Sequence, residues 1–158
     1  MWQKLIDTLD KLGDVYDGLA KLGERKHSAL VGIDMQGLSK ILDEEQLLTA
    51  KLHKLEQRRV ELLKGLSQSN IVSDLTRAED FYRSAPPAMS KLLIAAHKRL
   101  SQNVDRAVKL RDNNRVLAQC ALDAVQSRLN MLSGATVDPT YSGKGSCVSH
   151  QKKYDFKA

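Results

Sequence analysis

Proline is scarce in this chain, and its placement limits what the chain can fold into. The three prolines stand at positions 86, 87 and 139 of 158 residues. Proline breaks helices, so the long stretches without it are free to be helical, and no run of alternating β-branched residues predicts a strand. Leucine occurs twenty-four times, whereas Trp, Tyr and Phe make up only 4% of residues. We therefore predict an all-α protein with an aliphatic core.

Apolar residues in the first half of the chain repeat at intervals of three and four, which is the spacing of one helix face. A first helix is predicted from Trp2 to Leu30 and a second from Leu38 to Leu66. Asp34 is a good N-cap for the second helix, and Ile33 is spaced to pack on Leu38 as a hydrophobic staple.

The second half predicts one short helix and one long helix. A short helix is expected over residues 74–82, before Pro86-Pro87 breaks it. Pro87 suits the first turn of a third long helix that reaches Leu132, with Gly134 as its cap. The run Asp112-Asn113-Asn114 has weak helix propensity, so a kink is expected there. The whole is predicted to be an elongated antiparallel bundle.

Four polar residues interrupt the apolar stripes. Glu45 and Arg59 fall on the stripe of the second helix, and Asn103 and Asn114 fall on that of the third. Buried polar residues at such positions usually specify helix register at some cost in stability. We interpret both asparagines as structural, and the two charged residues as register-fixing or solvent-exposed.

The composition changes after residue 134. Residues 135–158 contain proline, glycine, serine and lysine without helical periodicity, which predicts a flexible tail. We therefore expect a helical bundle domain at 1–134 and a C-terminal tail at 135–158. Several apolar residues leave a docking role open for this tail: Val137, Tyr141, Val148, Tyr154 and Phe156.

The beginning of the chain is charged and amphipathic, without the uninterrupted apolar stretch of a signal peptide or a membrane span. We expect a cytoplasmic protein with no stable membrane insertion. Cys120 and Cys147 are far apart, unlike the dense cysteines of a secreted disulfide scaffold, and are expected to be reduced.

The formal net charge is +6, and seven basic residues against two acidic ones lie between Lys91 and Arg115. A solvated helix face is the commoner explanation of such a run. No aromatic residue is interleaved with these charges to stack on bases, and no nucleic-acid-binding module frames them. We expect no nucleic-acid partner.

No pattern in the sequence predicts catalysis. The four histidines lack an H-E-x-x-H spacing, and Cys147 with His150 gives two ligands where a structural zinc site needs four. In Gly143-Lys144-Gly145-Ser146 a glycine separates the lysine from the serine, which a phosphate-binding loop does not allow. The prediction is a protein that is not an enzyme, with no cofactor and no metal site.

Three stretches together resemble the FlgN family of flagellar export chaperones. Residues 29–59 are similar to that family's end of helix one and its second helix, although this stretch alone is a generic coiled-coil signal. The pair Asn113-Asn114 followed by 117–132 is similar to its substrate-binding C-terminal helix. The most specific stretch is 140–150, which resembles the tail pattern Tyr-x-x-x-Gly.

This resemblance implies binding of the hook-associated proteins of the hook-filament junction, protection from premature association, and delivery to the type III export gate. The tail residues Tyr141 and Gly145 would then dock on the cytoplasmic domain of the export gate. The residues that would bind the substrate proteins lie on the last helix: Asn114, Leu117, Ala121, Val125, Leu129 and Leu132.

The sequence is also compatible with purely structural roles. Long heptads say only that helices pair, so the chain could be a structural coiled-coil adaptor or a homo-oligomeric scaffold without a secretion role. The leucines of the last helix could be scaffold, Tyr141 could pack on the end of that helix, and a homodimer is left open.

Overall fold

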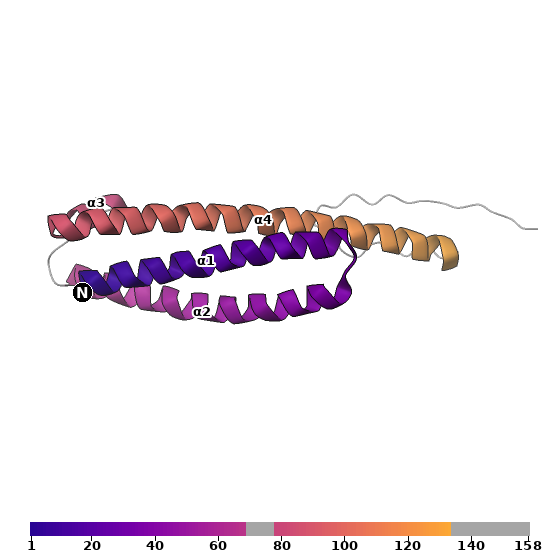
Figure 1. Ribbon diagram of the computed structural model, residues 1–158, viewed down its shortest axis with the longest axis horizontal. Helices are drawn as coiled ribbons and strands as arrows, with labels where there is room; N and C mark the ends of the chain where they lie inside the picture. The colour runs from indigo at the N-terminus through magenta and orange to yellow at the C-terminus, as the bar shows by residue number, and fades with distance from the viewer. Residues whose placement is uncertain (69–77, 134–158) are drawn as a thin grey trace, which may run out of the picture. The chain divides into compact units, whose positions relative to one another are not determined.

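The computed structural model describes residues 1–68 and 78–133. The described part consists of four helices, α1 (Trp2–Val31), α2 (Met35–Gln68), α3 (Ala78–Arg83) and α4 (Pro87–Ser133) (Figure 1). The prediction of an all-α protein with three long helices and one short helix is confirmed. The first four residues of the predicted short helix, and the predicted tail, lie outside the described residues, so the proposed domain division stays a prediction.

The chain divides into two compact units, Met1–Arg115 and Val116–Ala158. The first contains α1, α2, α3 and the beginning of α4, and the described part of the second is the remainder of α4. Helical structure continues without a break through Asp112–Asn114, where the sequence predicts a kink. The Asn114 side chain bonds α1 instead of competing for its own helix backbone, which favours continuity.

The turn between α1 and α2 reverses the chain within three residues. The Gly37 N–H donates to Asp34 Oδ1 at 2.9 Å, so the predicted N-cap is confirmed. The Asp34 N–H reaches back to the Ala29 carbonyl at 2.9 Å, and Ile33 between them adopts the left-handed region with φ of 55°. This conformation leaves the Ile33 side chain 79% exposed. The predicted staple on Leu38 is therefore wrong.

The core of the first unit is mostly aliphatic, as the composition predicts, and Tyr82 is the aromatic residue buried in it. Leu5, Leu9 and Leu12 of α1 meet Leu66 of α2 and Leu93 of α4, and all five are at most 2% exposed. Each such side chain contributes about 1.5–3 kcal/mol by leaving water. This cluster holds the three long helices together near the N-terminal end of α1.

Two asparagines of α4 fix its register against α1. Asn103 Nδ2 donates to the Gly13 carbonyl at 2.9 Å, and Asn114 Nδ2 donates to the Gly23 carbonyl at 2.7 Å. Both pairs advance together along the two helices, so α1 and α4 run parallel. At the second pair Gly23 permits the close approach of α4, because a Cβ on Gly23 would lie 3.1 Å from that of Leu110. The interpretation of both asparagines as register residues is confirmed.

Ion pairs align the helices further. Arg99 of α4 bonds Asp14 of α1 at 2.6 Å, and Lys26 of α1 bonds Glu45 of α2 at 2.7 Å. The stripe residue Glu45 thus fixes register between helices, whereas Arg59 pairs with Glu56 on its own helix at 2.8 Å. Part of the basic run on α4 is therefore matched by carboxylates of α1. The Arg99–Asp14 pair is exposed, so it specifies alignment more than it adds stability.

Candidate functional site: two partner-binding surfaces

The part of the chain that the structure describes shows neither a metal-ligand cluster nor a membrane-spanning helix. No three His, Cys, Asp or Glu side chains in this part of the chain gather where they could hold a metal ion. None of the helices within the described ranges is both long and apolar enough to cross a membrane. The features that call for an explanation are surfaces that could receive another protein.

The first such surface is on the second half of α4. Val125 is 56% exposed, Leu129 53% and Leu132 85%, although all are large and apolar. Successive residues of a helix are turned by 100°, and on this basis these three side chains and several other apolar ones lie within one sector of about 140° around the helix axis. We call this surface the α4 face, and its members are Leu117, Ala118, Ala121, Leu122, Val125, Leu129 and Leu132.

The opposite side of the same stretch is polar and internally bonded. Gln119 Nε2 donates to Asp123 Oδ1 at 2.9 Å, and Gln126 Nε2 donates to Asn130 Oδ1 at 3.0 Å. Bonds at this i, i+4 spacing support the helix from its polar side. The stretch is therefore an amphipathic helix, and such a helix is normally stabilised by packing its apolar face on another element.

Five of the six residues implied as substrate-binding lie together on the α4 face: half-buried Leu117, and exposed Ala121, Val125, Leu129 and Leu132. Asn114 lies on the same side of α4 but is 3% exposed and bonded to Gly23 and His27 of α1. Its side chain is not accessible to a partner in this conformation.

Two members of the α4 face, Ala118 and Leu122, were missed in the sequence analysis, and Leu122 is the larger and more exposed of them. Leu122 is 64% exposed, and it lies three residues before Val125 and seven before Leu129. This spacing is visible in the sequence and could have identified it. The residues implied for gate docking, Tyr141 and Gly145, lie outside the described residues.

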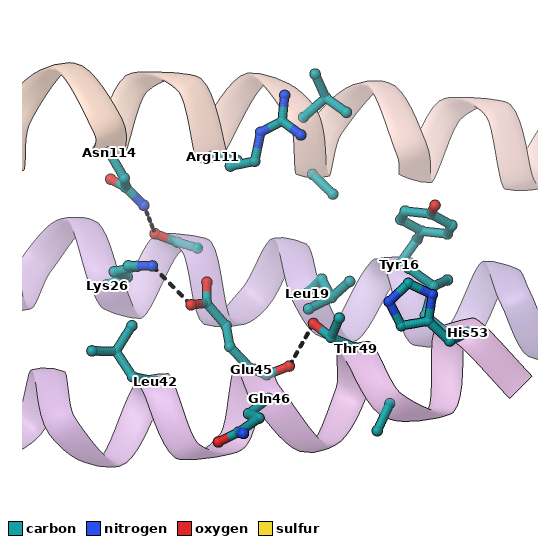
Figure 2. Close-up of a pocket in the computed structure, with 15 residues that line it drawn as sticks. Tyr16, Leu19, Lys26, Leu42, Glu45, Gln46, Thr49, His53, Arg111 and Asn114 are labelled. Atoms are coloured by element: carbon teal, nitrogen blue, oxygen red, sulfur yellow. Dashed lines mark hydrogen bonds and ion pairs between the residues drawn. The ribbon is translucent and has the colours of Figure 1, made fainter.

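The second surface is an open groove of about 860 Å³ in the first unit, lined by α1, α2 and α4 (Figure 2). Tyr16 and Leu19 of α1 contribute to it, Leu42 and Leu52 come from α2, and Val108 comes from α4. The sequence did not predict this groove, because its walls come from three helices whose separation is not encoded in any one periodicity.

Charges line the groove unevenly. Lys26 and Glu45 face each other across α1 and α2 at 2.7 Å (Figure 2). Arg111 lies on the α4 side, where its guanidinium bonds the carboxylate of its sequence neighbour Asp112 at 2.9 Å. Burial raises the pKa of the Tyr16 hydroxyl, with a further contribution from a nearby glutamate, so this group stays neutral and is a poor base.

Comparison with known proteins assigns the chain to a protein family. A family model described as FlgN protein matches residues 1–148. No curated protein and no solved structure matches the chain. The matched region includes the α4 face, the groove, and Tyr141 and Gly145.

Proposed function

The chain belongs to the FlgN family of flagellar export chaperones, and from this premise we propose that it binds the hook-associated proteins of the hook-filament junction. In this proposal it acts in the cytoplasm without catalysing a reaction. It keeps its substrate proteins from associating before secretion, and it delivers them to the export gate.

The exposed α4 face is the observation that carries this proposal. An amphipathic helix whose apolar side is exposed to solvent suits a chaperone, because a partner's amphipathic helix can pack along that side. Each square ångström of apolar surface covered in this way contributes roughly 25 cal/mol before the costs of association are subtracted. The side chains at i, i+4, i+8 and i+12 from Leu117 supply evenly spaced anchors: Ala121, Val125 and Leu129 follow it on this face.

Asn114 has a different role in the proposal from the one implied by resemblance. Its bond to the Gly23 carbonyl fixes α4 on α1 immediately before the α4 face begins. It would therefore position the binding segment instead of contacting the substrate protein.

The test is co-expression with hook-associated proteins, followed by size-exclusion chromatography with light scattering. The double variant Val125→Asp, Leu129→Asp should lose the complex, because two carboxylates would be placed in an apolar interface. Both residues are more than half exposed, so the variant should fold. Leu47→Asp is the matched control, since Leu47 of α2 is 67% exposed and belongs to neither surface.

Several results would contradict this assignment. Retention of the complex by the double variant would remove the α4 face as the binding surface. The chain could also elute as an oligomer when it is expressed alone, become monomeric in the double variant, and bind no hook-associated protein. That combination would identify it as a homo-oligomeric scaffold.

Delivery to the gate is proposed to depend on Tyr141, with Gly145 allowing close backbone approach. Tyr141→Ala should preserve substrate affinity while it lowers both binding to the cytoplasmic domain of the gate and secretion of the hook-associated proteins. Equal loss of substrate and gate binding would defeat this division of roles.

A further inference from the structure

We propose that the groove between α1, α2 and α4 is a second docking site, which accepts an acidic amphipathic helix of a partner protein independently of the α4 face. The groove lies wholly within the first unit. This inference goes beyond the proposed function and does not depend on which protein occupies the α4 face.

The dimensions of the groove suit a short helix. Its α2 wall runs from Leu42 to His53, and its α1 side runs from Tyr16 to Lys26. At 1.5 Å per residue these stretches are each roughly 15 Å long, which is about three helical turns. An occupant of that length would touch all three helices at once.

The walls are apolar and open where an occupant would lie. Leu42 is 46% exposed on α2, and Val108 is 37% exposed on α4. Short residues between the larger ones leave room for incoming side chains: Thr49, Ala50 and Ala107. An amphipathic helix would cover these side chains with its own apolar face.

The charges favour an acidic occupant. The lining holds two cations, Lys26 and Arg111, against one carboxylate, Glu45. Lys26 and Glu45 satisfy each other at 2.7 Å. The Arg111 side chain is 71% exposed and bonds a residue that does not line the groove, so it can also meet a carboxylate at the edge of a partner helix.

Two occupants supplied by the chain itself match less well. Residues 135–158 contain four lysines and two aspartates, so this segment has the same sign as the net charge of the residues that line the groove. A second copy offering its α4 face would bring one aspartate and one arginine between Leu117 and Leu132, with no excess of negative charge. A separate acidic partner is therefore the best electrostatic match.

The test uses the full chain and two synthetic amphipathic peptides of about eighteen residues, a length that supports helix formation. Both carry the same leucine stripe, and their polar positions are glutamate in one and lysine in the other. Fluorescence anisotropy gives the affinities, and amide chemical shifts locate the bound peptide. We expect the glutamate peptide to bind about fivefold or more tightly than the lysine peptide, with shifts concentrated in the groove.

Matched variants distinguish specific binding in the groove from non-specific hydrophobic binding. Leu42→Asp should weaken both peptides at least about tenfold, whereas Leu47→Asp on the same helix should not. Arg111→Glu should abolish or reverse the preference for the glutamate peptide, whereas Arg115→Glu should leave the preference in place. Val125→Asp with Leu129→Asp removes anchors of the α4 face only and should leave the shifts in the groove in place, so failure here is distinct from failure of the proposed function.

Several outcomes would overturn the proposal. These are absence of saturable binding, equal affinity for the two peptides, equal effects of Leu42→Asp and Leu47→Asp, or shifts confined to the α4 face. Concentration-dependent self-association that Leu42→Asp abolishes would assign the groove to a second copy instead.

Discussion

The two halves of α4 share one apolar stripe, which is buried in the first half and exposed in the second. In the first half Leu93, Ala96 and Leu100 are buried within the bundle. In the second half the stripe continues at the same spacing, but its large side chains are mostly exposed, and these make up the α4 face. Periodicity therefore determines which side of a helix is apolar, whereas the presence of a packed neighbour determines whether that side is buried. The predictions below test this contrast.

The largest expected effect comes from truncating one leucine in each half. Leu93→Ala should lower the free energy of unfolding by about 2–5 kcal/mol, because Leu93 is fully buried and its loss leaves a cavity. Leu129→Ala should stay within about 0.5 kcal/mol, because Leu129 already meets solvent. Urea unfolding followed by circular dichroism measures both. Equal losses would mean that the α4 face is part of the core.

A smaller effect is expected at the boundary between the halves. Asn114→Ala should destabilise the chain by about 1–3 kcal/mol, because it removes a buried hydrogen bond of 2.7 Å to the Gly23 carbonyl. Its neighbour Asn113 is exposed and is the control, with little expected change for Asn113→Ala. Thermal melting of the two variants makes the comparison. Similar melting temperatures would show that Asn114 does not hold α4 on α1.

A gain in stability is expected where α1 ends, at a site that belongs to neither half of α4. Ile33 is a β-branched residue with φ of 55°, which is costly for any residue with a side chain. Ile33→Gly should therefore stabilise the chain by about 1 kcal/mol, since the exposed side chain adds little packing. Ile33→Ala keeps the strain and should give no comparable gain. Urea unfolding distinguishes the two, and a loss of stability in the glycine variant would contradict this account.

The smallest expected effect is the response of the first unit to acid. The pKa of Asp17 is lowered, mainly by its hydrogen bond with Lys21, and the pKa of Glu44 is lowered by its hydrogen bond with Arg25. Lowered pKa values mean stability that is present above the ordinary values of 3.8 and 4.5 and is lost as the pH falls through the folded-state values.

Unfolding measured between pH 6 and pH 3 should thus show a modest loss at the acid end. Since both carboxylates are exposed, added salt should reduce this loss. Glu44→Gln should remove part of the pH dependence. An unchanged pH profile in that variant would show that the pair with Arg25 does not contribute.

Several local features followed from the sequence alone. The placement of the prolines and the 3,4 spacing predicted the long helices, and Asp34 predicted the start of α2. The polar residues Asn103 and Asn114 predicted register points on α4. These predictions succeeded because helix formation, capping and the side of a helix that is apolar depend on residues within a few positions of one another.

Only the tertiary structure decided which of these residues meet solvent. It buried Asn114 against Gly23, exposed Ile33 through a left-handed turn, left the α4 face open, and separated the walls of the groove. Each of these outcomes depends on how closely residues distant in sequence approach. That distance is set by packing between helices, and a stripe of leucines has the same spacing whether or not another helix covers it.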